Sequence, residues 1–216
     1  ASHPTYNPNN LDTEGEALST SPSAPLLNRA TQGLYPIGTA LRPLLSAEFG
    51  DAQPTESELQ QLYQSLGLYQ APAINMPVAF ETKNNTSKEL KVSPLQMSLA
   101  AALLSHQGIE PTPRIAMAVD TPEQGWVVLS AESQPVEVIQ PEAANEAALS
   151  FIVDGKPYWS HIGRAIADGE PITWLLAGTL PDWGGTPLVL VVTLEEKNNS
   201  LANHIGNSIL DMALNQ

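Results

Sequence analysis

The sequence predicts an α+β domain. Three apolar segments with strand character lie near the C-terminus, at residues 158–167, 172–180 and 188–194. Residues 181–185, Pro-Asp-Trp-Gly-Gly, separate the last two and are typical of a hairpin connection. Helix-start signals precede these strands, and an amphipathic pattern over residues 201–214 closes the chain with a helix.

Length and composition set the broad class. A chain of 216 residues can bury one full core, so a single domain over residues 1–216 is expected. The net charge of −14 argues against nucleic acid or an anionic membrane as a partner. The absence of cysteine excludes disulfides and fits an exported protein. No run approaches the roughly 18 apolar residues of a membrane span, and none reads as a signal sequence.

The first part of the chain is predicted from turn and breaker residues. Residues 11–25 are polar, rich in Ser and Thr and aperiodic, so a surface loop is expected there. A Pro-x-Gly turn at residues 36–38 then delivers the chain into a short helix, which should begin at Thr39 and run to Phe49.

Two capping boxes predict the next helices. Thr55 is followed three residues later by Glu58, and Ser93 by Gln96, so helices are expected from these residues onward. Residues 70–91, between the two helices, are expected to form a loop. Further on, the sequence predicts short strands at 115–119, 126–129 and 136–139, a helix over 142–153 and the strands already described. Glu195 and Glu196 are expected to form a solvated strand end.

The most informative stretch spans residues 28–43 and surrounds Thr39. A side-chain oxygen at the start of a helix meets unpaired backbone N–H groups and the positive end of the helix dipole. Arg42 lies three residues further on, which places it on the same side of a helix that begins at Thr39. Such an arrangement suits a nucleophile with a nitrogen base behind it.

This stretch resembles the transpeptidase domain of class B penicillin-binding proteins, where the pattern is close to N-R-A-x-Q-G-x-Y-P-P-G-S-T-F-K-P. The chain keeps the frame from Asn28 to Gly38 and the later Pro43, but has Thr39 and Arg42 where the family has its reactive Ser and Lys. Residues 92–100 are close to the family's V-T-P-L-Q-M-A-x-A, and residues 1–9 resemble its A-S-x-P-x-x-D-P-N.

The resemblance implies an antiparallel central sheet flanked by helices on both faces, as in β-lactamases and transpeptidases. The family's first strand normally precedes the phrase matched at residues 1–9. The sheet is therefore expected to be truncated at its N-terminal edge, with that strand and a membrane anchor lying upstream of this chain.

The other two reactive motifs of the family are absent or altered. The chain contains no Ser-x-Asn, and the stretch between Arg42 and Leu66, where the family carries that motif, is much shorter. His161-Ile162-Gly163-Arg164-Ala165 occupies the place of the family's K-T-G-T-A. Histidine can replace lysine as a part-time cation, but Ile162 cannot hydrogen-bond a carboxylate. Gly163 retains the glycine, which permits close backbone approach on an edge strand.

Acyl transfer at Thr39 would need a base. Threonine can act as a nucleophile, but Arg42 cannot take its proton, because guanidinium stays charged and has no acceptor lone pair. In the plainer interpretation Thr39 only starts a helix, Arg42 is a surface or ion-paired side chain, and His161 is exposed at a strand end. Positional equivalence thus makes Thr39, Arg42, His161 and Gly163 the candidate catalytic residues, with Ile162 and Arg164 as candidate substrate contacts.

Three functions remain open. The leading hypothesis is a catalytically inactive transpeptidase-like domain that acts as a scaffold in peptidoglycan synthesis or cell division. It would work outside the cytoplasm, with cell-wall synthesis or division proteins as partners and with the membrane reached only through the upstream anchor. The alternatives are an active D,D-transpeptidase that uses Thr39, and a non-covalent binder of peptidoglycan stem peptide that clusters Arg42, His161 and Arg164. No cofactor is expected, and His3, His106, His161 and His204 are too scattered for a metal site.

Overall fold

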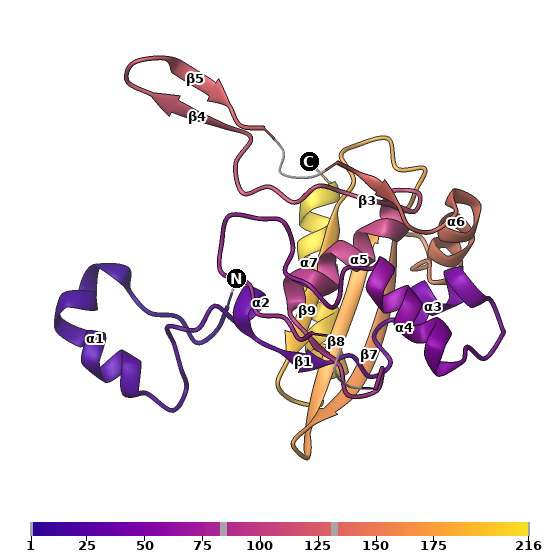
Figure 1. Ribbon diagram of the computed structural model, residues 1–216, viewed down its shortest axis with the longest axis horizontal. Coiled ribbons are helices and arrows are strands. Elements are labelled where there is room, and N and C mark those ends of the chain that lie inside the picture. The colour runs from indigo at the N-terminus through magenta and orange to yellow at the C-terminus, as the bar shows by residue number, and fades with distance from the viewer. Residues whose placement is uncertain (1, 83–85, 131–133, 216) are drawn as a thin grey trace.

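The computed structural model describes residues 2–82, 86–130 and 134–215, and its architecture is α+β (Figure 1). The elements, in chain order, are η1 (Pro8–Asn10), α1 (Leu11–Thr20), α2 (Arg29–Gln32), β1 (Tyr35–Pro36), α3 (Arg42–Phe49), α4 (Glu56–Ser65), β2 (Lys91–Val92), α5 (Pro94–Ser105), β3 (Ile109–Glu110), β4 (Ala118–Thr121), β5 (Gly125–Val128), β6 (Val136–Glu137), α6 (Pro141–Ser150), β7 (Tyr158–Ala167), β8 (Glu170–Thr179), β9 (Val189–Leu194) and α7 (Asn199–Leu214).

The central sheet is antiparallel and has the strand order β7-β8-β9, which confirms the three predicted strands and the hairpin between the last two. β7 pairs with β8 along its whole length, from Tyr158 opposite Thr179 to Ala167 opposite Glu170. Every residue of β8 from Ile172 to Thr179 is buried, because β8 is the middle strand and both faces of the sheet are covered.

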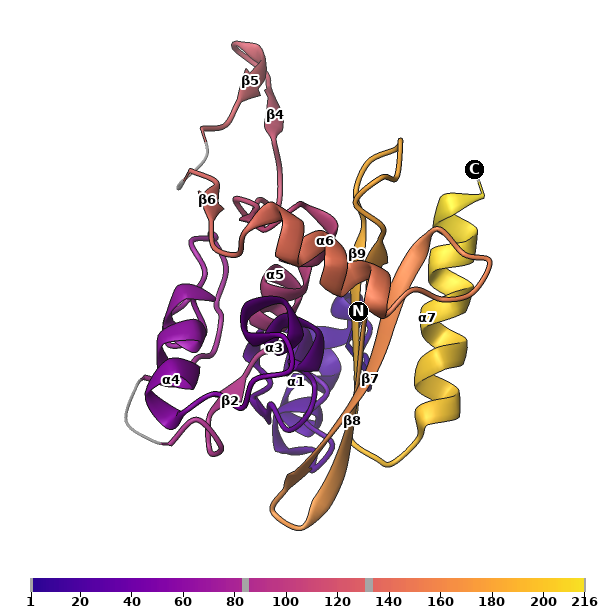
Figure 2. The same ribbon diagram turned by 90° about the vertical axis from the view of Figure 1, so that its right-hand side faces the viewer.

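Helices cover the two faces of this sheet, as Figure 2 shows: α3, α5 and α6 lie on one side and α7 lies on the other. Successive residues of a strand point to opposite faces. Trp159 and Trp174 therefore belong to the core under α3, α5 and α6. Their neighbours Tyr158 and Leu175 belong to the smaller core under α7.

Both predicted capping boxes are present at the starts of α4 and α5. The Ser93 Oγ accepts the Gln96 backbone N–H at 3.3 Å, and the Gln96 Oε1 accepts the Ser93 backbone N–H at 3.0 Å. The Gln96 Nε2 also donates to the carbonyls of Leu68 and Gln70, each at 3.0 Å. Gln96 thereby ties the segment that follows α4 to the first turn of α5.

The short strand β1 is fixed to the central sheet. β1 pairs with β2, and the Trp174 indole N–H donates to the Pro36 carbonyl at 3.0 Å. The Tyr35 ring meets the Trp174 ring edge to face, with centroids 5.9 Å apart. The chain therefore leaves β1 at a defined point beside β8, and this point sets the position of the turn that contains Thr39.

The predicted loop over residues 11–25 is wrong in its first part, where the chain forms α1. None of the residues of α1 is buried, so the helix lacks the apolar stripe by which buried helices are recognised in a sequence. Its stability comes from local terms. Asp12 and Glu14 lie in the first turn, where negative charge is favourable, and the Asn10 Nδ2 donates to the Glu14 carboxylate at 2.9 Å.

Strands β4 and β5 form a hairpin that stands away from the rest of the molecule (Figure 1). Both of its faces carry exposed apolar side chains. Trp126 and Val128 are 73% and 77% exposed on one face, and Met117 and Val119 are 72% and 40% exposed on the other. None of the helices in the described part of the chain is long and apolar enough to cross a membrane.

Candidate functional site

The candidate site lies where the turn after β1 packs against β7. Two glycines permit this close approach. A Cβ on Gly163 would lie 2.4 Å from the Ala40 Cα, and a Cβ on Gly38 would lie 2.0 Å from the Arg164 carbonyl oxygen. Gly38 also has a φ of +54°, in the left-handed region that favours glycine. The resemblance placed the segments of Thr39 and His161 in one site, and the structure brings them into contact.

Thr39 lies in the turn before α3 and not at the start of the helix. The helix begins at Arg42 with Leu41 as its N-cap residue, so the prediction of a helix start at Thr39 is wrong by three residues. The reason is the contact with β7, which holds Thr39 in a turn where its carbonyl accepts the Arg42 N–H at 3.3 Å. Arg42 is therefore the first helical residue and does not share a helix face with Thr39.

Thr39 and Arg164 are joined by a reciprocal pair of hydrogen bonds. The Thr39 N–H donates to the Arg164 carbonyl at 3.0 Å, and the Arg164 N–H donates to the Thr39 Oγ1 at 2.9 Å. In the second bond the hydroxyl takes the place of a backbone carbonyl on the outer edge of β7. Both backbone N–H groups beside the Thr39 hydroxyl are thus already paired within the protein.

His161 faces the carbonyl of Thr39 and not its hydroxyl. Its Nε2 lies 3.0 Å from the Thr39 carbonyl oxygen, which can only accept, so Nε2 carries the proton and donates. The ring also meets Phe151 edge to face, at a centroid distance of 5.2 Å. Burial lowers the pKa of His161, the nearby Arg42 charge lowers it further, and the bond to Thr39 opposes the change. The imidazole is therefore neutral at neutral pH and supplies no cation.

The other two candidates project from the opposite face of the sheet. Ile162 packs against the core under α7. The Arg164 side chain is exposed, and its Nε donates to the Asn199 Oδ1 at 3.4 Å, at the start of α7. The structure thus brings Thr39, Arg42, His161 and Gly163 together and sends the side chains of Ile162 and Arg164 elsewhere. The predicted cluster of three basic side chains is not formed.

This geometry limits what the site can do chemically. The Thr39 hydroxyl accepts one N–H and has the Arg164 carbonyl as a distant acceptor at 3.5 Å. Within the described residues, no carboxylate, amine or imidazole nitrogen is hydrogen-bonded to it, so no side chain is placed to take its proton. None of the residues that the structure describes form a group of three His, Asp or Glu side chains suited to a metal ion.

Comparison with solved structures identifies the fold. Penicillin-binding protein A from Mycobacterium tuberculosis, in a structure of its acyl-enzyme with imipenem, matches with a TM-score of 0.77 at 19% identity, over 99% of this chain and 69% of that one. The D,D-transpeptidase domain of a peptidoglycan glycosyltransferase from Eggerthella lenta matches with a TM-score of 0.74 at 14% identity, over 100% of this chain and 74% of that one. The fold is that of a penicillin-binding-protein transpeptidase domain.

A third match, penicillin-binding protein 3 from Mycobacterium tuberculosis in complex with aztreonam, has a TM-score of 0.65 at 12% identity, over 86% of this chain and 64% of that one. A scan against protein-family models finds no match, and no curated protein matches the chain. At these identities the comparison establishes the transpeptidase-like fold, and the chemistry has to be argued from the residues of this chain.

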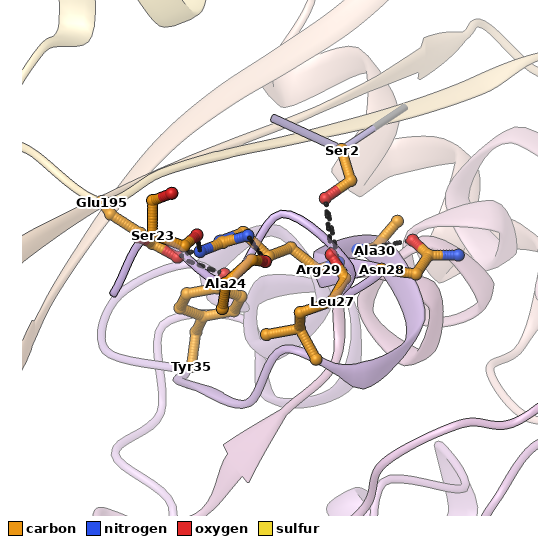
Figure 3. Close-up of polar contacts among 9 residues, drawn as sticks. All are labelled: Ser2, Ser23, Ala24, Leu27, Asn28, Arg29, Ala30, Tyr35 and Glu195. Carbon is orange, nitrogen blue, oxygen red and sulfur yellow. Dashed lines mark hydrogen bonds and ion pairs between the residues drawn. The ribbon is translucent and has the colours of Figure 1, made fainter. Parts of the chain in front are cut away.

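Within the transpeptidase-like fold, Arg29 has a structural role that the sequence did not reveal. Figure 3 shows its side chain between Glu195 of the segment after β9 and the loop before α2. The Arg29 Nε donates to the Glu195 Oε1 at 3.1 Å, and its terminal nitrogens donate to the carbonyls of Ser23 and Ala24. The Tyr35 hydroxyl donates to the same Glu195 oxygen at 2.7 Å. Glu195 directly follows β9 and stays about half exposed, as expected for a solvated strand end, and its carboxylate is also shared between two partners.

Asn28 and Arg29 belong to the stretch that resembles the family, and their contacts give both residues a structural role. Asn28 is the N-cap of α2, where its Oδ1 accepts the Ala30 N–H at 3.2 Å. The Arg29 backbone N–H donates to the Ser2 Oγ at 3.0 Å (Figure 3). These residues hold the N-terminal segment against the sheet. No local pattern indicates the contact, because Arg29 and Glu195 lie 166 positions apart.

Proposed function

We propose that this chain is a transpeptidase-like domain that no longer transfers acyl groups and that acts as a scaffold or interaction module in peptidoglycan synthesis or cell division. Two observations support the proposal. The fold is shared with penicillin-binding-protein transpeptidase domains, and the solved structures that match include an acyl-enzyme and a D,D-transpeptidase domain. The positions that resemble the reactive Ser and Lys of that family hold Thr39 and Arg42.

The observation that carries the proposal is the state of the Thr39 hydroxyl. A hydroxyl attacks a carbonyl only when a base within hydrogen-bond reach accepts its proton. The two ionisable candidates at the site are unsuitable, because Arg42 is a permanent cation and the His161 Nε2 already donates to the Thr39 carbonyl. The two N–H groups that could stabilise a developing oxyanion are also paired between Thr39 and Arg164.

We also propose where the domain works and which proteins it binds. By analogy with the family, the domain works on the outer side of the cytoplasmic membrane, where peptidoglycan is built. Its partners are proteins of cell-wall synthesis or division. We do not propose binding of free stem peptide, because that function needs Arg42, His161 and Arg164 to cluster. The Arg164 side chain bonds to Asn199 on the face of the sheet opposite His161.

Labelling with a fluorescent penicillin tests the proposal directly. The purified chain is incubated with the label and run on a denaturing gel beside an active class B penicillin-binding protein as the positive control. We expect a labelled band for the active protein and none for this chain. The Thr39→Ala variant is the matched control, because it removes the hydroxyl and keeps the backbone hydrogen bonds of residue 39 to Arg164 and His161. A covalent band on this chain that disappears in Thr39→Ala would refute the inactive reading and establish acylation at Thr39.

A further inference from the structure

A cavity of about 360 Å³ lies away from the turn of Thr39, beneath the segment that follows α4. Its walls come from the end of α4, from α5 and from the paired strands β3 and β6. The walls are mainly apolar and include Leu66, Leu99 and Val136. Gln96 also lines the cavity, and its amide ties the carbonyls of Leu68 and Gln70 to the start of α5.

One carboxylate lines this cavity. Glu110 is half-buried on β3 directly opposite Val136, and both residues contribute to the wall. Its Oε1 lies 3.9 Å from the position that a Cβ on Gly67 would occupy. The Glu110 carboxylate has no hydrogen-bond or ion-pair partner within residues 2–82, 86–130 and 134–215. Burial raises the pKa of its carboxyl group.

We infer that this cavity binds an alkyl cation, an ammonium or guanidinium on a short apolar stem, with Glu110 as its counter-ion. A half-buried carboxylate without a partner costs free energy that a cation would recover. The leucine and valine walls suit the stem, as they do for the methylene groups of Lys and Arg. Gln70 also lines the cavity, and its side-chain amide offers one further hydrogen-bonding group. The overall charge of −14 attracts cations to the surface.

The inference is independent of the proposed function, because it concerns no acylation and none of the residues around Thr39. Titration of the ¹⁵N-labelled protein with n-butylammonium, followed by amide NMR spectra, tests it. We expect shifts confined to the amides around the cavity, including Gly67, Gln70 and Leu99. The neutral analogue n-butanol should bind about tenfold more weakly, because it lacks the charge-assisted bond to Glu110.

Two Glu→Gln variants test whether the Glu110 carboxylate is the group that binds the cation. Glu110→Gln keeps the shape of the side chain, removes its charge and should weaken n-butylammonium binding about tenfold. Glu137→Gln makes the same change on β6, outside the cavity, and should leave binding unchanged. Equal affinity for n-butylammonium and n-butanol would overturn the inference even if Glu110→Gln failed to fold. Shifts that spread over the acidic surface, or a loss in Glu137→Gln equal to that in Glu110→Gln, would also overturn it.

The same experiment distinguishes two sources of the cation. N-acetyl-lysine-N-methylamide presents the ammonium on a piece of peptide backbone. Tighter binding of this compound than of n-butylammonium indicates a lysine side chain of a protein partner as the occupant. Equal or weaker binding indicates a free small amine.

Discussion

Replacement of Gly163 by alanine tests whether the turn of Thr39 lies against β7 as closely as the structure describes. The new Cβ would lie 2.4 Å from the Ala40 Cα, 2.6 Å from the Ala40 nitrogen and 2.9 Å from the Ala40 Cβ. Ordinary contacts between such atoms need about 3.5–4 Å, so the turn and the strand must separate by about 1 Å. Two of the three atoms belong to backbone, which cannot move aside as a flexible side chain could.

The cost follows from the hydrogen bonds that cross this contact. Thr39 is bonded to Arg164 at 3.0 and 2.9 Å and to His161 at 3.0 Å. A separation of about 1 Å carries these distances toward 4 Å, beyond hydrogen-bond range. Three lost bonds at about 0.5–1.5 kcal/mol each, with the residual strain of overpacking, give a destabilisation of about 2–5 kcal/mol. That is a large share of the about 5–15 kcal/mol of a typical domain.

Urea unfolding followed by tryptophan fluorescence measures this cost, since Trp159 and Trp174 are fully buried. Gly184→Ala is the matched control, because an added Cβ there meets nothing within 4 Å. We expect a lower unfolding midpoint for Gly163→Ala and an unchanged one for Gly184→Ala. A free energy of unfolding for Gly163→Ala within about 0.5 kcal/mol of wild type would show that the turn and the strand are further apart than described.

Two further outcomes follow from other buried contacts. Ser105→Ala removes the acceptor of the Trp159 indole N–H, a buried bond of 3.0 Å, and should cost about 1–3 kcal/mol in the same urea assay; no loss would mean that the indole finds another partner. Arg42→Gln removes a positive charge beside His161 and should move the His161 pKa upward, as followed by the ring resonances in an NMR pH titration. The wild-type pKa is lowered in the folded state, so the unfolded chain binds the proton first and stability falls as pH drops below about 6.5. An unchanged His161 pKa in Arg42→Gln would show that the Arg42 guanidinium lies too far from the His161 ring to affect it.

Helices and strands are predicted best where a short sequence pattern has one structural meaning. The capping boxes at Thr55 and Ser93 start helices where expected, and the strand over residues 158–167 has the predicted bounds. Each of these signals acts within a few residues. The helix over residues 11–20 was missed for the same reason, since a helix that buries nothing carries no apolar period.

The candidate site could be predicted only in part. The contact between Thr39 and His161 joins residues 122 positions apart, and only the resemblance to a known family placed them together. The strand prediction alone already indicates which site residues share a face of the sheet. Alternate residues of a strand share a face, so His161 and Gly163 belong together and Ile162 and Arg164 do not. The orientation of His161 toward a carbonyl depends on where the turn sits, and no pattern in the sequence reports that.

The exposed hairpin of β4 and β5 has a practical consequence for anyone who handles this protein. Bare tryptophan, valine and methionine side chains on an accessible two-stranded ribbon are prone to stick to one another in concentrated solution. Mutual repulsion is expected to oppose this association, because each molecule carries a formal charge of −14 at neutral pH. That repulsion vanishes near the isoelectric point, which lies at a pH of about 4.4. We therefore expect the purified protein to precipitate most readily in buffers near pH 4.4.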